Sequence, residues 1–265
     1  MNRLYVTGDT HSDVSRFATN SFFEQKELDK SDIVVITGDF GLVWSQNNKD
    51  KTENYWLDWL DNKPFTTLFV DGNHENFDRL DNMPVSTWNN GKVHKLRESV
   101  IHLMRGEIYD VAGTKIFAFG GAPSHDINGL ASPEELKANY AAGVLNKNDK
   151  NYEHDLKKLK NTGLAYRVNH VNWWRQEMPN DAEMDYAWQN LEKHDFKVDY
   201  VFTHEAPASD AVLLGYHDIP NNLSMFLEDV RARCEFKHWF FGHYHENKRI
   251  NLTESCLYEQ IIRVK

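Results

Sequence analysis

Ile33-Val34-Val35-Ile36-Thr37-Gly38-Asp39 is the stretch that decides the fold of this chain. Its first five residues form a continuous β-rich run, which is typical of a central strand buried on both faces. The run stops at a glycine followed by an aspartate. Two other stretches have the same form, Leu4–Asp9 and Thr66–His74, and each also passes from an apolar run into glycine and polar residues. This repetition predicts strands that end at one edge of a sheet.

The spacing of these stretches predicts an α/β fold. Asp39 stands 30 residues after Asp9, and Asn73 stands 34 residues after Asp39. Both gaps fit βαβ units of ~30 residues or more. Between the last two runs, Trp56, Trp59 and Leu60 recur at i, i+3 and i+4, which predicts one buried face of a helix.

The rest of the chain departs from this alternation once. Strands are predicted within 101–104, 108–111, 115–119, 200–203, 238–241 and 257–264, and helices around 184–191 and 223–230. Residues 124–180 are instead polar and rich in Asn and Lys, with one short helix expected after the capping sequence at Ser132. Because this segment has few apolar residues for a core of its own, we expect a single domain over 1–265 with a cap-like insertion at about 124–180.

Composition and charge exclude several classes of function. The 265 residues are 40% hydrophobic and 26% charged, which is typical of a globular protein. A net charge of -10 disfavours an extended nucleic-acid partner, since binding a phosphate backbone needs a basic surface. No apolar run approaches the ~18–20 residues of a membrane span, and the strand-like start predicts no signal peptide. With only Cys234 and Cys256, we expect a cytoplasmic protein without a membrane partner.

Polar residues follow directly after five of the predicted strands. Sites form at the carboxyl ends of strands in open α/β sheets, so these residues are expected to meet. Imidazole and carboxylate groups together suit Mn, Fe, Co or Zn. A single Asp-x-His or an isolated histidine is more often a turn or a core residue, but five clusters in order are poorly explained by chance. The set is too large for one tetrahedral site and fits two adjacent ions: Asp9, His11, Asp39, Asn73, His74, His204, His243 and His245.

These ordered motifs resemble the calcineurin-like metallophosphoesterase family, and most closely its small bacterial or phage-type members. The resemblance covers residues 4–245 and rests on Asp-x-His at 9–11, Gly-Asp at 38–39, Gly-Asn-His-Glu at 72–75, His204, and Gly-His-x-His at 242–245. It implies an α/β fold, namely a four-layer α/β/β/α sandwich of two mixed sheets flanked by helices.

The resemblance also implies the ligands of two divalent metal ions. One ion would be held by Asp9, His11, Asp39 and His245, and the other by Asp39, Asn73, His204 and His243, with Asp39 bridging. Manganese is the expected metal, and Fe, Co, Ni or Zn are alternatives. His74 would contact the phosphate and act as general acid. Asp39 and Asn73 are the other residues expected at the reacting phosphate.

The physics of such a centre fits phosphate-ester hydrolysis. Two metals ~3.5–4 Å apart clamp the attacking and leaving oxygens of an in-line displacement, and a water bridging them becomes hydroxide near neutral pH. Two divalent ions carry four positive charges, while two carboxylates and one hydroxide carry three negative charges. The centre therefore has a net charge of +1, which suits a small phosphate ester. We therefore expect a metal-dependent phosphoesterase that acts on mono- or diesters by attack of a metal-bridging hydroxide.

Departures from the best-known relatives argue against a protein phosphatase of their branch. Serine/threonine protein phosphatases carry an Arg before Gly-Asn-His-Glu and an Asp-Arg-Gly after the second Gly-Asp. Here Asp71 precedes the first motif, and Phe40 and Gly41 follow the second. The insertion could replace the missing anchors, because Arg167 offers a bidentate phosphate contact and Trp174, or its neighbour Trp173, could stack on a substrate. Alternatively, a tryptophan here anchors the insertion to the core.

Two other functions stay open at this point. One is a catalytically weak scaffold or binding protein on the same fold, against which the complete ligand set and His74 argue. The other is a nuclease of the same superfamily, which the acidic balance disfavours. The sequence leaves the natural substrate and the oligomeric state open.

Overall fold

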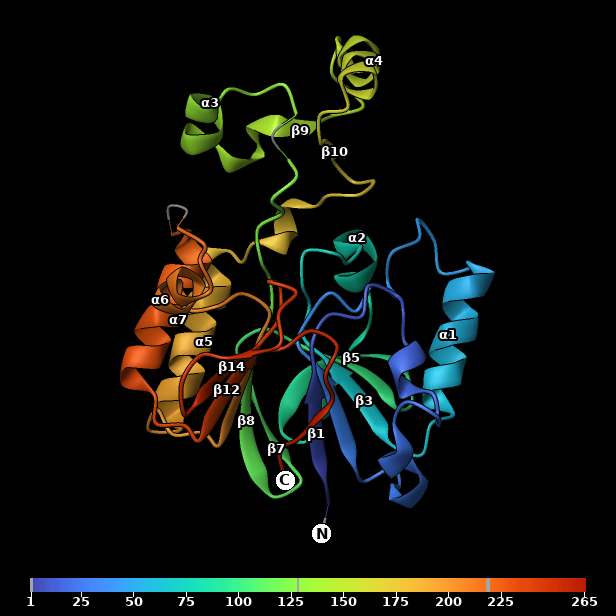
Figure 1. Ribbon diagram of the computed structural model, residues 1–265, viewed down its shortest axis with the longest axis vertical. Helices are drawn as coiled ribbons and strands as arrows, with labels where there is room; N and C mark the ends of the chain where they lie inside the picture. The colour runs from blue at the N-terminus through green and yellow to red at the C-terminus, as the bar shows by residue number, and fades with distance from the viewer. Residues whose placement is uncertain (1, 128, 218–219) are drawn as a thin grey trace.

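The computed structural model describes residues 2–127, 129–217 and 220–265. Two large sheets, one of seven strands and one of six, face each other and carry helices on their outer surfaces. Figure 1 shows the helical layers on the two sides of the sheets and the insertion beyond one end of them. The predicted α/β/β/α sandwich of two mixed sheets is confirmed.

The seven-stranded sheet contains the N-terminal strands. From edge to edge it comprises β15 (Ile262–Arg263), β1 (Leu4–Thr7), β2 (Ile33–Ile36), β3 (Thr66–Phe69), β6 (Val100–Leu103), β5 (Gly91–Arg97) and β4 (Val85–Trp88). Its four central strands, β1, β2, β3 and β6, are parallel, and the other three run antiparallel to a neighbour. The register pairs Val6 with Val35 and Val35 with Leu68. The β4–β5 hairpin was not predicted, because its residues are largely polar.

The six-stranded sheet collects most of the later strands. Its order is β13 (Lys248–Arg249), β14 (Glu254–Cys256), β12 (His238–Phe241), β11 (Tyr200–Thr203), β8 (Thr114–Phe119) and β7 (Glu107–Val111). The strands from β14 to β8 are parallel, and β7 and β13 are antiparallel to their neighbours. The parallel strands of both sheets therefore bring the residues that follow them to shared edges.

Alternate residues of each strand enter different cores. Val35 of β2 packs between the two sheets with Phe202 and Phe240, which come from the opposite sheet. Val34 and Ile36 point the other way, into the core beneath the outer helices. Because both of its faces are covered, β2 is apolar at every position, and this is why it forms a continuous apolar run in the sequence.

The outer layers are helical. The seven-stranded sheet is covered by α1 (Lys51–Asp61) and the 3-10 turns η1 (Ser15–Phe17) and η2 (Phe23–Glu27), and the six-stranded sheet by α5 (Asp181–Lys193), α6 (Ala208–Leu213) and α7 (Asn222–Arg233). The short α2 (Phe77–Leu80) follows β3. In α1 the buried apolar residues are Leu57 and Leu60, with Trp56 and Trp59 at the margin of the core, so the buried face is rotated from the predicted one. None of the helices in the described ranges combines the length and apolar composition needed to cross a bilayer.

The insertion stands beyond the end of the sandwich that lies opposite the N-terminus (Figure 1). It comprises α3 (Pro133–Ala138), η3 (Tyr140–Gly143), β9 (Val144–Leu145), α4 (Tyr152–Thr162), β10 (Arg167–Val168) and η4 (Arg175–Glu177), with β9 and β10 paired in parallel. A capping box between Ser132 and Glu135 starts α3, as predicted. Its own apolar core is small and centres on Ile127, Val144 and Trp173.

Candidate metal centre

Four of the predicted ligands form one tight group, which we call the first half of the centre. Asp9, His11, Asp39 and His245 each offer one ligand atom, and these four atoms all lie within 4.8 Å of one another. The Nε2 atoms of His11 and His245 are 2.9 Å apart, and Nε2 of His11 lies 3.7 Å from Oδ2 of Asp39. The four residues follow β1, β2 and β12, so three strand ends build this half.

The second half of the centre comprises Asp39, Asn73, His204 and His243. Nε2 of His204 lies 3.3 Å from Oδ1 of Asp39. Nδ1 of His204 donates to the Thr37 carbonyl at 2.8 Å, which leaves Nε2 unprotonated in the neutral ring and facing the carboxylate. Each oxygen of Asp39 thus faces a different half, the arrangement that a bridging carboxylate needs.

Unpaired buried atoms test whether cations fit here. Seven buried side-chain atoms of the described residues have no hydrogen-bond partner, and three of them, Asp9 Oδ2, Asn73 Oδ1 and His204 Nε2, belong to the centre. His245 Nε2 comes to 3.2 Å of Asp9 Oδ2, but without the angle of a hydrogen bond. A buried polar atom left unpaired costs about 1–3 kcal/mol. Bound cations would satisfy the three atoms of the centre together, and their imidazole, carboxylate and amide chemistry suits divalent transition metals.

Strained backbone is found at four other predicted ligands or shared ligands of the centre. His11, Asp39, His243 and His245 have positive φ angles of 44°, 46°, 69° and 51°. Such a conformation costs a non-glycine residue about 1–3 kcal/mol and persists only where the surroundings impose it. Here the loops hold each other, because the Asp39 carbonyl accepts from the backbone N–H groups of Thr10 and His11 at 3.1 and 2.8 Å. The strain therefore lies where the ligands must be aimed.

Two glycines let the backbone approach the ligands closely. Gly38 has a φ of 98°, and a Cβ atom there would overlap the ring of His204. A Cβ atom at Gly242 would overlap the Asp9 carboxylate. These contacts explain why a glycine precedes the polar cluster at both strand ends.

Buried charges stabilise each other in the metal-free centre. Burial by itself would raise the pKa of Asp39, but the charge of His204 holds it well below the usual range. Burial lowers the pKa of His204, and the carboxylates of Asp39 and Asp9 overcome this effect and raise it to about 10. Burial, with Asp39 nearby, raises the pKa of Glu75 to about 8. Glu75 accepts backbone N–H groups of Phe40 and Gly72 at 2.7 and 2.8 Å, and so ties two motif loops together.

His74 lies beside the first half. Its backbone N–H donates to Oδ1 of Asp39 at 2.8 Å. Its ring stacks on Trp44 at 5.6 Å between centroids and meets His11 edge-on at 4.9 Å. Burial lowers the pKa of His74, and the guanidinium of Arg167 lowers it further. The side chain is thus fixed next to the shared carboxylate without being one of the predicted ligands.

The comparison with protein families agrees with this geometry. The sequence profile of the family described as calcineurin-like phosphoesterase matches residues 2–247 of the 265. The chain belongs to the calcineurin-like phosphoesterase family. Membership makes it a metal-dependent phosphoester hydrolase by class, and the match spans all five strand-end motifs. A search of curated proteins found no significant match.

The two insertion residues predicted to bind substrate, Arg167 and Trp174, have different surroundings in the structure of this phosphoesterase. Arg167 donates through Nε to Asp126 at 2.8 Å, and its positive charge lowers the pKa of His74, so it lies within electrostatic range of that residue. Trp174 is only 1% exposed, donates through Nε1 to Asp78 at 2.8 Å, and packs edge-on against Trp44. A buried ring cannot stack on substrate. The predicted substrate contact of Trp174 is therefore corrected: it supports Trp44, which in turn stacks on His74.

Trp173 has a different environment from its neighbour. It is 3% exposed and packs with Ile127 and Val144 in the small core of the insertion. Its Nε1 donates to the hydroxyl of Tyr140 at 3.2 Å. The alternative that a tryptophan anchors the insertion to the core thus fits Trp174, which packs with Phe77 and Leu80, whereas Trp173 packs within the insertion.

Sequence reasoning missed residues that hold the second half from outside. Oγ of Ser124 accepts from Nδ2 of Asn73 at 3.4 Å and donates to Glu177 at 2.7 Å, which turns Oδ1 of Asn73 the other way. Nε2 of His125 lies 2.8 Å from Nε2 of His243, and the two rings are stacked. Ser124 and His125 lie in the loop after β8, so they too are polar residues that follow the end of a strand. Glu177 lies 53 residues further on and carries no such signal.

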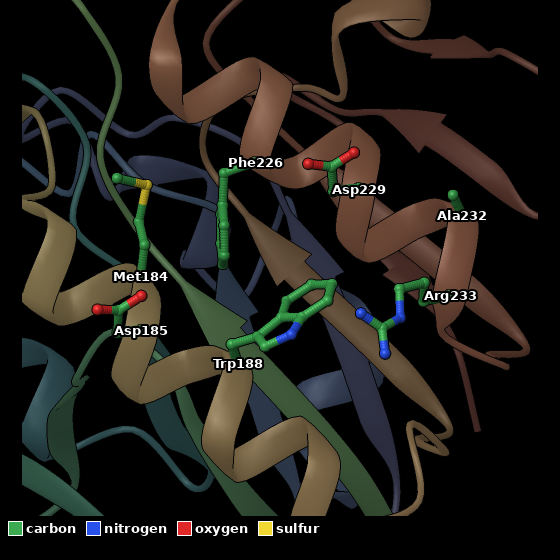
Figure 2. A pocket seen from close by; sticks show the side chains of 7 residues that line it. All are labelled: Met184, Asp185, Trp188, Phe226, Asp229, Ala232 and Arg233. Atoms are coloured by element: carbon green, nitrogen blue, oxygen red, sulfur yellow. The ribbon is translucent and has the colours of Figure 1, made fainter.

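Two hollows on the phosphoesterase differ in their relation to the centre. One, of about 610 Å³, lies between α5 and α7, and Figure 2 shows the neighbouring rings of Trp188 and Phe226 from these helices in its wall. No predicted site residue lines it. The other, of about 850 Å³, includes Ser124, His125 and Tyr244 in its wall and therefore borders the second half.

Proposed function

We propose that this chain is a binuclear-metal phosphoesterase that hydrolyses small phosphate mono- or diesters, with manganese as its metal and the cytoplasm as its location. The observation that carries the proposal is the set of buried, unpaired atoms Asp9 Oδ2, Asn73 Oδ1 and His204 Nε2 around the Asp39 carboxylate. The net charge of -10 supports a small ester as the substrate, because an extended polyanion would be repelled by the rest of the surface.

The reaction exchanges one phosphorus–oxygen bond for another. The oxygen of a water molecule bonds to phosphorus, the bond from phosphorus to the alcohol oxygen breaks, and the departing alcohol takes up a proton. When bound, two divalent cations supply positive charge for the phosphoryl oxygens and lower the pKa of the attacking water. Asp39 would hold both cations, since each of its oxygens faces one half of the centre.

His74 is the residue best placed to give the proton to the alcohol. Its ring is held by Trp44 on one side and His11 on another, and its backbone is tied to Asp39. This fixed position beside the shared carboxylate supports a general acid, whose removal typically costs ~10²–10⁴-fold in rate. The positive charge of Arg167 acts on His74, and we expect this side chain to bind a phosphoryl oxygen.

The test combines metal analysis with a substrate panel. Protein stripped with a chelator is reloaded with Mn, Fe, Co, Ni or Zn, its metal content is measured, and hydrolysis of phosphomonoesters and phosphodiesters is followed. Two ions per chain and hydrolysis with at least one metal are expected. Two bound ions without hydrolysis of any ester would favour a binding protein, and absence of metal binding would overturn the proposal.

A further inference from the structure

The cavity of about 850 Å³ lies between the insertion and the α6–α7 region and borders the second half of the centre. Three residues of its wall are direct neighbours of second-half ligands. Ser124 bonds to Asn73, while Glu205 and Tyr244 each follow immediately after a ligand histidine in the sequence. A fourth, His125, contacts a ligand through space, 2.8 Å from Nε2 of His243. The ligands themselves do not line the cavity, so the group that leaves the metals would reach it past Ser124 and His125.

The wall of the cavity combines three tyrosines and several apolar residues with polar and charged ones. Tyr140 and Leu136 come from the insertion, and Tyr216 packs edge-on against Tyr244 at 4.8 Å on the opposite side. The one carboxylate of the wall, Glu205, is engaged internally, because it accepts from the Tyr244 hydroxyl, from Asn221 Nδ2 and from the Ala206 N–H. Such surfaces suit a flat apolar group, and the volume falls within the ~300–1,000 Å³ of small-molecule pockets.

Two cations of the insertion complete the wall. The guanidinium of Arg175 lies 5.6 Å over the ring of Tyr140, and Lys137 lines the same cavity. In the part of the chain that the structure describes, no carboxylate comes within 4.0 Å of Arg175 or Lys137. Arg167, by contrast, pairs with Asp126 at 2.8 Å. Arg175 is thus the cation best placed to meet an anionic group of a bound molecule in the cavity.

We infer that this cavity receives the leaving alcohol of the substrate and selects an aromatic alcohol that carries a second anionic group, which Arg175 binds. The inference rests on the proposed function, since it assigns a place to the alcohol of a hydrolysed ester. The metal centre touches only the phosphoryl group common to all such esters, so selectivity must arise in a neighbouring region, and the cavity is built of groups that distinguish one alcohol from another.

The test compares phenyl phosphate with 4-carboxyphenyl phosphate. The ratio of their kcat/KM values is measured for the wild-type protein and for Arg175→Gln, so that the intrinsic reactivity of each ester cancels between proteins. The preference for the carboxylated ester is expected to fall about tenfold or more in Arg175→Gln, as for loss of a hydrogen bond to a charged group. Arg249→Gln is the matched control, because Arg249 is exposed and does not line the cavity. It should keep the wild-type ratio.

A binding measurement separates this inference from the proposed function. Calorimetric titration with the product 4-hydroxybenzoate needs no turnover, and weaker binding to Arg175→Gln than to wild type is expected. If the metal-loaded protein hydrolyses no ester but binds 4-hydroxybenzoate through Arg175, the cavity assignment as an anion-binding aromatic site stands and the proposed function fails. If both esters are hydrolysed and Arg175→Gln changes neither the ratio nor the binding, the inference is overturned and the phosphoesterase proposal stands.

Discussion

The two halves of the candidate metal centre share Asp39 but are held in place differently. In the first half, the ligand atoms lie within 4.8 Å of one another and their loops bond directly to each other. In the second half, hydrogen bonds to Ser124 and to the Thr37 carbonyl orient Asn73 and His204, respectively. His243 contacts His125 through its ring nitrogen. Outer contacts of this kind set the orientation and the affinity of metal ligands.

The difference shows which part of the chain builds each half. The sandwich alone supplies the first half, whereas Ser124, His125 and Glu177, which hold the second half from outside, belong to the insertion. The insertion therefore supplies outer contacts to ligands of the second half. Changes in the insertion should disturb the second ion and spare the first, and the following experiments test this asymmetry.

Asp39→Asn should have the largest effect, because it removes the one ligand common to both halves. We expect reduced occupancy of both metal sites and a loss of rate beyond the ~10²–10⁴-fold that removal of a general acid typically costs. Elemental analysis after desalting, together with a phosphatase assay, measures both. Full occupancy by two ions in Asp39→Asn would show that the halves are independent and that the carboxylate does not bridge.

His74→Asn should reduce the rate next most strongly while leaving both halves loaded. A drop of ~10²–10⁴-fold in kcat is expected. It should be largest for alkyl esters, whose poor leaving groups need the proton most. Metal content is the control. If alkyl and p-nitrophenyl esters lose rate equally, His74 positions the phosphate and does not act as the acid.

Ser124→Ala should distinguish the halves directly. Loss of the contact that orients Asn73 is expected to weaken the second ion by ~10–100-fold, as for other outer contacts of metal ligands, and to leave the first unchanged. Competition with a chelator of known affinity resolves the two sites. Ser132→Ala, at the cap of α3 in the same insertion, is the matched control. Equal weakening of both ions by Ser124→Ala would contradict the asymmetry.

Arg167→Ala should have the smallest effect of the four. It leaves all metal ligands in place, so both ions stay bound. The KM for phosphate esters should rise about tenfold, the size expected for loss of a hydrogen bond to a charged group. Lys157→Ala, on the polar helix α4, controls for the change in net charge. An unchanged KM for every ester would exclude Arg167 from phosphate binding.

The sequence by itself determined the central strands and the residues that follow them. A run such as Ile33–Ile36 is apolar at every position because both faces of the strand are covered, so the signal lies within the run. The ends of parallel strands share an edge, which predicted that Asp9, Asp39 and His245 would meet. Capping at Ser132 and the start of α3 are likewise encoded within four residues.

Only the tertiary structure decided the surroundings of these residues. Two adjacent tryptophans signal a large apolar surface, but whether Trp174 faces a substrate or Trp44 depends on a distant loop that packs against it. The link from Glu177 through Ser124 to Asn73 joins three segments far apart in the chain. Local pattern fixes which atoms a residue offers, whereas burial and partners are set by elements remote in sequence, and their contacts leave no periodic trace.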